Sequence, residues 1–282
     1  MIAYLGTGLL GSGFVRAMLA KGEQVRVWNR SAAKAQALAE YGAIVCATPA
    51  EAVQGASRIH MTLKDDASVN EVLQAALPGF APGVVIADHT TTSVAGAIER
   101  TALWKEQGFT YVHAPVFMGP PNALESTGYM LVSGDQDVIA GLMPALQRMT
   151  GKVINFGPET GKAAGMKLAG NLFLIAFTAG ISDTLSLTHS LGIPATDLMD
   201  LFNEWNPGAM LPARLKRMAG GVYDKPSWEL DMARKDAGLM IAEAEKAGRP
   251  LAIIPAAAAE MDRWIARGYG NSDWTVIAKD NL

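Results

Sequence analysis

The sequence predicts an α/β fold, a doubly wound parallel sheet in its first part, followed by an all-α second part. Up to about residue 157, short β-like runs alternate with amphipathic helical stretches. Such alternation with short connections is typical of a parallel sheet covered by helices on both faces. Beyond that point the β-like runs stop and helical stretches follow one another. We therefore expect two domains, residues 1–158 and residues 159–282.

The elements of the first domain follow from short apolar runs and from helical spacing. The predicted strands are Ile2–Leu5, Gln24–Trp28, Arg58–Thr62, Val84–Ala87, Phe109–Ala114, Met130–Ser133 and Lys152–Asn155. The predicted helices between them include Leu10–Lys21, Ala32–Tyr41, Ser93–Gln107 and Gln136–Met149.

The second domain is predicted to begin with one long interdomain helix, Gly161–Leu191, which ends at a Gly-Ile-Pro segment. Glycine and proline clusters separate the helices that follow it. These helices are Ala195–Glu204, Leu211–Met218, Ser227–Ala247 and Ile254–Arg267.

Composition narrows the class of protein. Half of the 282 residues are hydrophobic, 18% are charged and the formal net charge is −3, without the basic excess typical of nucleic-acid-binding surfaces. The single cysteine, Cys46, cannot form an intramolecular disulfide, which suits a reducing compartment. No signal peptide is recognisable, and the longest apolar run, Leu172–Ile181, is too short to span a bilayer. We expect a soluble, cytoplasmic protein that binds neither nucleic acid nor membrane.

A glycine motif follows the first predicted strand and precedes an apolar helix. It reads Gly6-Thr7-Gly8-Leu9-Leu10-Gly11 and matches G-x-G-x-x-G. The pattern alone is weak, but this context is typical of a dinucleotide-binding Rossmann domain. In that motif Gly6 permits a tight turn, Gly8 lets the backbone approach a pyrophosphate, and Gly11 lets helix and strand pack closely. The helix N-terminus offers free N–H groups to the phosphates.

The end of the second strand favours NADP over NAD as the cofactor. A site for NAD places an acidic residue there to bind the ribose 2′-hydroxyl. This chain has Asn29-Arg30-Ser31, with Lys34 one turn later. A guanidinium suits the 2′-phosphate of NADP.

The long helix carries the strongest candidate for chemistry. Lys167 and Asn171 are four residues apart and therefore share one helical face. Apolar neighbours make a lysine at this place unusual, and burial would lower its pKa toward a range useful for proton transfer.

These motifs, in this order, resemble the β-hydroxyacid dehydrogenase family, which includes 3-hydroxyisobutyrate dehydrogenase, tartronate semialdehyde reductase and succinic semialdehyde reductase. The resemblance covers nearly the whole chain. Besides the glycine motif and K-x-x-x-N at Lys167 and Asn171, the matching segments are Asn29–Ser31, Asp88–Thr91, His113–Gly119, Lys235-Asp236 and Gly268–Asp273.

The resemblance implies a reaction and roles. Hydride would pass between nicotinamide and the carbonyl or hydroxyl carbon of a small β-hydroxyacid or semialdehyde-like substrate, with Lys167 as general acid or base and Asn171 orienting the substrate. Thr91 would lie near the nicotinamide, Leu63 on the adenosine side, and Lys235 near nicotinamide and substrate. In similar proteins a partner subunit covers the long helix, so we expect a homodimer or homotetramer.

The chain departs from the family where the substrate carboxylate binds. The family motif D-A-P-V-S-G-G has Phe117-Met118-Gly119 in place of Ser-Gly-Gly, and His113 in place of the aspartate. The loss of a hydroxyl and the added bulk predict a larger or less anionic substrate. The alternative is a rearranged loop that still binds a short acid through Lys235 or Asn122.

Three rival interpretations remain open. Imine reductases are similar but generally lack the lysine, and the family's Asn-Asn pair is Gly170-Asn171 here. A non-catalytic dinucleotide-binding scaffold would tend to lose Lys167. The first domain also resembles that of decarboxylating 6-phosphogluconate dehydrogenase, whose basic phosphate-binding residues we do not find. The four histidines are scattered, so we expect no metal site.

Overall fold

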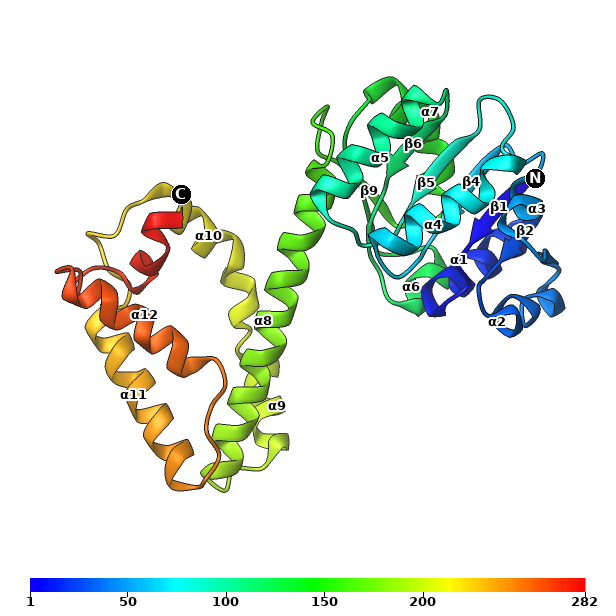
Figure 1. The fold of residues 1–282 in the computed structure, drawn as a ribbon. Coiled ribbons are helices and arrows are strands. Elements are labelled where there is room, and N and C mark those ends of the chain that lie inside the picture. Colours follow the sequence, from blue (N-terminus) through cyan, green and yellow to red (C-terminus); the bar gives the residue numbers. More distant parts are fainter. Residues whose placement is uncertain (282) are drawn as a thin grey trace. The chain divides into compact units, whose positions relative to one another are not determined.

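The structure is a computed structural model that describes residues 1–281, and it divides into two compact units, Met1–Asn171 and Leu172–Leu282. The first unit is the predicted α/β domain and the second is entirely helical (Figure 1). This division falls inside the long helix, whereas the sequence places the boundary before it. The boundary at 158/159 stays a prediction.

A six-stranded parallel sheet forms the centre of the first unit, in the order β3-β2-β1-β4-β5-β6. Its strands are β1 (Ile2–Leu5), β2 (Val25–Trp28), β3 (Ile44–Val45), β4 (Arg58–Met61), β5 (Val85–Asp88) and β6 (Thr110–His113). The chain reverses its direction of progress across the sheet between β1 and β4. Ligands of such sheets bind at that reversal, beyond the carboxyl ends of the strands.

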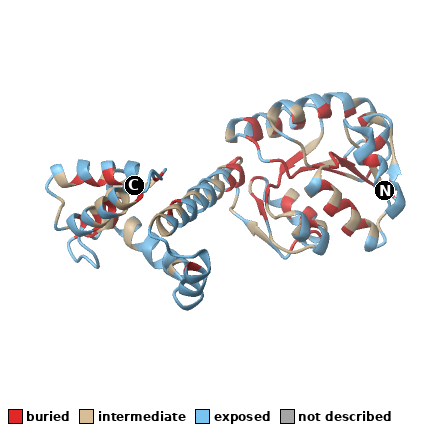
Figure 2. Ribbon diagram, turned by 90° about the horizontal axis from the view of Figure 1, so that it is seen from below, coloured by how far each residue is buried: buried red, intermediate tan, exposed pale blue. Residues whose placement is uncertain are grey.

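Helices cover both faces of this sheet. They are α1 (Leu9–Ala20), α2 (Ala32–Gln36), α3 (Pro49–Val53), α4 (Asp66–Ala76), α5 (Val94–Glu106), α6 (Pro120–Glu125) and α7 (Gln136–Gln147). Alternate residues of β1 point to opposite faces: Tyr4 packs with Phe14 of α1, and Leu5 packs in the cluster that contains Leu73 of α4. The central strand β1 is therefore buried on both sides, whereas Ile44 on the edge strand β3 is exposed (Figure 2).

The last predicted strands belong to a second sheet, which corrects the expectation of one sheet. This three-stranded sheet consists of β7 (Val116–Phe117), β8 (Tyr129–Val132) and β9 (Lys152–Asn155), and its β7–β8 pair is antiparallel. The chain passes from the first sheet to the second directly after β6. Ala114 N still donates to Asp88 O of β5, whereas Pro115 O accepts from Leu131 N of β8. The two residues of β7 are too few to show a pattern in the sequence.

The other differences are the short strand β3, which the sequence does not predict, and several helices. The predicted helix over residues 32–41 is α2 followed by a 3₁₀ turn, Ala39–Tyr41, that ends at Gly42 with φ of 95°. Two helices that the sequence does not predict begin at side-chain caps. Thr48 Oγ1 accepts from Glu51 N at the start of α3, and Asp65 Oδ1 accepts from Ser68 N at the start of α4.

The helical unit is built on the long helix α8 (Lys162–Ser190), whose residues from Leu172 onward belong to it. The other helices are α9 (Ala195–Glu204), α10 (Leu211–Gly220), α11 (Leu230–Lys246), α12 (Ile254–Ala266) and a 3₁₀ helix, Trp274–Asn281. Within it, Asp183 of α8 accepts backbone N–H groups of Ala252, Ile253 and Ile254 before α12. Helix α11 begins at Leu230 instead of at the predicted Ser227, because Ser227 donates to the buried Asp273 through its N–H and its hydroxyl.

Helix α8 is also long and apolar enough, by length and composition alone, to cross a membrane. It has 29 residues, and an 18-residue stretch within it has a mean hydropathy of 1.4. The apolar run read from the sequence is only part of this helix. The expectation that the protein does not bind a membrane stays a prediction.

A buried chain of hydrogen bonds crosses the sheet through two histidines. Arg58 can only donate, at 3.1 Å to Nε2 of His60, so His60 carries its proton on Nδ1 and donates it to Nε2 of His89 at 2.9 Å. Nδ1–H of His89 in turn donates to the carbonyl oxygen of Ala114 at 2.8 Å. Both rings are therefore neutral. Burial lowers the pKa of both, and on His60 the neighbouring His89 and the charge of Arg58 lower it further.

These histidines predict a pH dependence of stability. Their folded-state pKa values lie below the unfolded value of about 6.5, so their contribution is complete above that pH and is lost as the pH falls toward the folded-state values. We expect the free energy of unfolding of the first unit to fall by up to ~1.4 kcal/mol per pH unit for each histidine. His60→Gln keeps a donor and an acceptor but cannot take up a proton. We expect it to remove the contribution of one histidine to this slope, measured by urea unfolding between pH 5 and 8. The exposed His189→Gln is the control, and an equal effect of both variants contradicts the assignment.

Candidate functional site

A groove of about 560 Å³ lies over the carboxyl ends of β1, β2 and β4 in the first unit. It brings together most of the residues predicted to bind a cofactor: Gly6, Gly8, Leu9, Leu10, Gly11, Asn29, Arg30, Ser31, Lys34 and Leu63. Residues that the sequence analysis missed also line it: Trp28, Pro49, Thr62, Lys64, Ser68, Glu71, Val72 and Ala75. Half of the missed residues belong to α4 and the others to the ends of β2 and α3 and to the loop after β4, and no local pattern places them beside the glycine motif.

The glycine turn has the geometry that a dinucleotide requires. Gly6 has φ of 93°, and a Cβ on it would lie 2.2 Å from the backbone oxygen of Thr62. A Cβ on Gly11 would lie 2.1 Å from the oxygen of Gly6. Gly8 differs, because a Cβ there meets no atom within 4 Å and would point into open space. The first two glycines are thus needed for packing, whereas Gly8 leaves a backbone surface open to a pyrophosphate.

Thr7 and Asn29, both predicted to bind the cofactor, hold the glycine turn in place. Asn29 Oδ1 accepts from the backbone N–H of Thr7 at 2.9 Å, and Asn29 Nδ2 donates to Ser31 O at 3.0 Å. The side chain of Thr7 is buried and does not line the groove. Asn29 and Thr7 therefore act by fixing the loop, and the groove exposes Arg30, Ser31 and Lys34 beside them.

The loops after β4 and β5 are joined side by side. Leu63 N donates to Thr90 Oγ1 at 2.9 Å, and Thr90 N donates to Asp88 Oδ1 at 2.8 Å. The Tyr111 hydroxyl donates to the other oxygen of Asp88 at 2.6 Å. Thr91 is exposed on this loop but does not line the groove. The sequence analysis missed Thr90, although its hydroxyl connects the two loops.

Lys167 and Asn171 share one face of α8 and are hydrogen-bonded, Nζ to Oδ1, at 3.0 Å. The Lys167 side chain is buried, with 8% of its surface exposed, and burial lowers its pKa. Its Nζ lies 4.2 Å from the centre of the Phe117 ring on β7. The start of α8 is tied to the same unit, because Ala163 N donates to Ser133 Oγ at 2.9 Å. A buried amine with one amide partner can hold or release a proton at Nζ.

The segment predicted to bind substrate is only partly open. Phe117 faces Lys167, whereas Met118 packs against the core that contains Phe14 and Met130. The Gly119 N–H donates to Asn122 Oδ1 at 2.9 Å, so this pair is already bonded. The Gly119 N–H is therefore committed to Asn122 and not free to bind an anion.

The remaining candidates lie elsewhere. Lys235 is on α11 in the helical unit, where it pairs with Asp236 at 2.9 Å, and its place beside a nicotinamide stays a prediction. Within residues 1–281, no cluster of three or more histidine, cysteine or acidic side chains could hold a metal ion.

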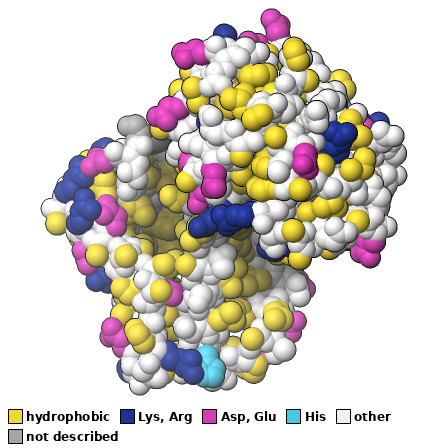
Figure 3. All heavy atoms as spheres, turned by 45° about the vertical axis from the view of Figure 1, so that its right-hand side comes forward, with side chains coloured by type: hydrophobic (Ala, Val, Ile, Leu, Met, Phe, Trp, Pro, Cys, Tyr) yellow, Lys and Arg dark blue, Asp and Glu magenta, His cyan; other side chains and the backbone are white. Residues whose placement is uncertain are grey.

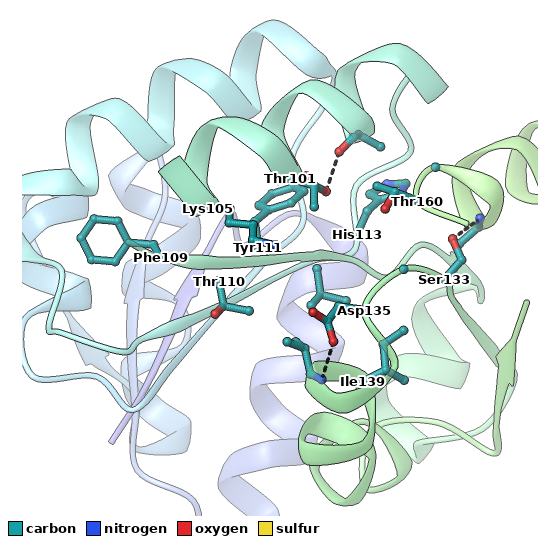
Figure 4. Close-up of a pocket in the computed structure, with 16 residues that line it drawn as sticks. Thr101, Lys105, Phe109, Thr110, Tyr111, His113, Ser133, Asp135, Ile139 and Thr160 are labelled. Carbon is teal, nitrogen blue, oxygen red and sulfur yellow. Dashed lines mark hydrogen bonds between the residues drawn. The ribbon is translucent and has the colours of Figure 1, made fainter. Parts of the chain in front are cut away.

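A second cavity of about 250 Å³ lies beside β6 and contains none of the predicted site residues (Figure 4). Several of its polar groups are bonded within the fold: Thr101 donates to Ala97 O, Ser133 accepts from Ala163 N, and Asp135 caps α7. Nδ1 of His113, at its edge, is fully buried and has no partner in the part of the chain that the structure describes. We assign this cavity no role.

A family model described as the NAD binding domain of 6-phosphogluconate dehydrogenase matches residues 1–157, more than half of the chain. The chain belongs to this family. Residues 1–157 thus form a nicotinamide-dinucleotide-binding domain, and the groove lies where such a cofactor binds in a sheet of this kind. The predicted Rossmann fold is confirmed.

Sequence relatives match nearly the full length of this chain. N-PAC of Homo sapiens, named a cytokine-like nuclear factor, is 28% identical over 98% of this chain, which spans about half the length of that relative. An uncharacterized oxidoreductase of Bacillus subtilis, YfjR, is 23% identical over 99% of this chain and 98% of its own.

The fold is shared with two solved reductases. An imine reductase from Myxococcus stipitatus in complex with NADP+ has a TM-score of 0.91 at 19% identity, covering 99% of each chain. A reductive aminase from Aspergillus terreus in complex with NADPH4, cyclohexanone and allyl amine has a TM-score of 0.90 at 23% identity, covering 100% of this chain and 99% of its own. The predicted resemblance to β-hydroxyacid dehydrogenases, with similarity to imine reductases, is confirmed.

Arg30 gives a test of cofactor choice. Arg30→Ala removes the guanidinium that would face the 2′-phosphate, a charged hydrogen bond worth about 1.5–3 kcal/mol. We expect the Kd for NADPH to rise ~10- to 100-fold and the Kd for NADH to change little, measured by fluorescence titration. Arg263→Ala, on an exposed arginine of the helical unit, is the control. Equal weakening of both cofactors by Arg30→Ala contradicts a role in 2′-phosphate binding.

Proposed function

We propose that this protein is an NADP-dependent oxidoreductase that acts on the carbonyl or hydroxyl carbon of a small molecule, with Lys167 as general acid and base. The observation that carries the proposal is the buried amine of Lys167, held by Asn171 in the same unit as the glycine turn. The substrate class that the family resemblance implies is a β-hydroxyacid or a semialdehyde.

The residues of the groove suit a nicotinamide dinucleotide with a 2′-phosphate. The open backbone at Gly8 would hold the pyrophosphate, and Arg30 and Lys34 would hold a 2′-phosphate. When bound, the nicotinamide supplies or accepts the hydride.

The proton is the part that this chain supplies. In reduction, the carbonyl carbon of the substrate gains the hydride, and Nζ of protonated Lys167 donates a proton to the carbonyl oxygen. Solvent then restores the proton on Nζ. In oxidation, neutral Nζ accepts the hydroxyl proton. Asn171 Oδ1 fixes the direction of Nζ at 3.0 Å. Because burial lowers the pKa of Lys167, both protonation states are accessible nearer to neutral pH than for an exposed lysine.

Imine reduction is the second candidate, and two observations favour it. The solved structures with the same fold include an imine reductase and a reductive aminase. Phe117 also places an aromatic ring beside Lys167, where a cyclic apolar substrate could pack. A panel of aldehydes, ketones, semialdehydes and cyclic imines, followed by NADPH absorbance, separates the two candidates. Turnover of imines alone overturns the carbonyl proposal.

A non-catalytic scaffold is favoured only by the likeness to N-PAC, whose name describes a nuclear factor. Substitution of Lys167 separates this scaffold from an enzyme. We expect Lys167→Ala to lower kcat/KM by ~10²- to 10⁴-fold and to leave the Kd for NADPH unchanged, because positioned proton transfer is lost. Lys162→Ala, on the exposed lysine five residues earlier in α8, is the matched control. Activity that survives in Lys167→Ala, or is absent from the wild type, contradicts the proposal.

We also propose that the protein is a cytoplasmic homodimer whose copies meet along α8. Large apolar side chains are exposed on this helix within the helical unit: Leu172, Phe173, Leu174, Ile175, Phe177, Ile181 and Leu185. Hydrophobic side chains are widely visible on the face drawn in Figure 3. Asp183 ties the same helix to the segment before α12, which favours a second protein copy over a lipid bilayer as its cover.

The dimer has its own test. Ile175 and Leu172 are both 70% exposed, and a charge at either place cannot be buried in an apolar interface without a partner. We expect the wild type to sediment at twice the chain mass and Ile175→Glu to sediment as a monomer. Leu103→Glu, on an apolar residue of α5 that is 42% exposed, is the control. A monomeric wild type, or a dimer that survives Ile175→Glu and Leu172→Glu, contradicts this interface.

A further inference from the structure

We infer that Phe117 and Gly170 form a matched pair that removes carboxylate recognition beside Lys167 and selects substrates with an uncharged, apolar group next to the reacting carbon. The inference rests on the proposed role of Lys167 and names the substrate class of that same site. Neither residue is unusual by itself. Their contact across β7 and α8 assigns them one function.

The first step is steric. A Cβ on Gly170 would lie 2.3 Å from Cζ, 2.8 Å from Cε1 and 3.2 Å from Cε2 of the Phe117 ring. Any side chain at position 170 therefore displaces the ring. Glycine at position 170 leaves room for the ring against the backbone of α8, although glycine within a helix destabilises it by about 0.5–1 kcal/mol relative to alanine.

The second step is electrostatic. Nζ of Lys167 lies 4.2 Å from the centre of the Phe117 ring, within the range of a cation–π interaction. The face of the ring carries partial negative charge, which attracts the ammonium and repels a carboxylate. Phe117 also has no hydroxyl to donate.

The third step concerns the other donor of the loop. In the family pattern a serine and two glycines at positions 117–119 would hold the carboxylate. Here the Gly119 N–H is bonded to Asn122 Oδ1, and the Met118 side chain packs into the core. The loop therefore offers an aromatic wall where the family offers hydrogen-bond donors. An apolar substituent loses unfavourable contact with water against such a wall.

The two departures from the family pattern compensate each other. The family's serine is Phe117 in this chain, and the first asparagine of its Asn-Asn pair is Gly170. An asparagine at 170 needs the space that the ring occupies, and a serine at 117 leaves that space free. Either change alone produces a clash or a void, whereas both together restore a packed site.

A double-mutant cycle in thermal unfolding tests the pair without any substrate. Gly170→Ala lowers the Tm in the wild-type background and raises it, through helix propensity, in the Phe117→Ser background. Gly165→Ala on the same helix is the matched control, because a Cβ there meets only Val94 Cγ2, at 3.7 Å. Equal effects of Gly170→Ala and Gly165→Ala, or additive effects of the two changes in the cycle, overturn the steric pairing.

The selection is tested with a semialdehyde that bears a free carboxylate and with its methyl ester. We expect the wild type to have the higher kcat/KM for the ester. The double variant Phe117→Ser with Gly170→Asn shifts the ratio toward the acid by at least ~10-fold, the equivalent of one charged hydrogen bond. A wild type that prefers the acid, or an unchanged ratio in the double variant, overturns the inference.

Failure of the proposed function has a different signature. If the wild type reduces neither aldehyde, the reaction is wrong, but the unfolding cycle still tests the pair. The preference between a carboxylate and its ester is then measured as the Kd values of butyrate and methyl butyrate for the NADPH-saturated protein, by calorimetry. Butyrate binding as tightly as the ester overturns the selection, and a preference for the ester that the double variant reverses supports it.

Discussion

The burial of one amine organises the site of this protein. Lys167 lies on a helix that is apolar over many turns, and water is replaced around Nζ by the amide oxygen of Asn171 and the face of Phe117. Removing a charge from water is costly unless partners compensate, and the cost here appears as a lowered pKa. An ordinary surface lysine would remain protonated over the working pH range. The tertiary contact between β7 and the start of α8 therefore gives this residue the lowered pKa on which its proposed role as acid and base rests.

The shape of the cofactor groove depends on hydrogen bonds between the segments that form it. Asn29 holds the glycine turn, Thr90 joins the loops after β4 and β5, and Asp88 receives Thr90 N and the Tyr111 hydroxyl behind them. These bonds fix backbone segments that come from separate strands. Because the strands are parallel, their carboxyl ends meet at one edge, and the loops need only short polar side chains to be joined.

A shared fold does not determine the chemistry of this family member. The imine reductase and the reductive aminase have nearly the same backbone at 19% and 23% identity, and N-PAC is more similar in sequence while being named a nuclear factor. Function on such folds depends on a few side chains at the site. For this chain the proposed side chains are Lys167, Asn171 and the ring of Phe117, where a buried amine lies against an aromatic ring.

The sequence by itself determined the Rossmann domain, the all-helical second part and the dinucleotide motif. Periodicity and the glycine spacing are local, and Gly11 is needed by a contact with Gly6 within one strand–turn–helix unit. The pairing of Lys167 with Asn171 was predictable for the same reason, since residues four apart on a helix are neighbours.

Only the tertiary structure decided the contacts between distant segments. The separate sheet of β7–β9, the linking role of Thr90, the committed Gly119 N–H and the ring of Phe117 over Gly170 are examples. Phe117 and Gly170 are more than fifty residues apart, and nothing local to either one indicates the other. Local patterns report which element a residue belongs to, whereas close packing between elements decides which side chains meet.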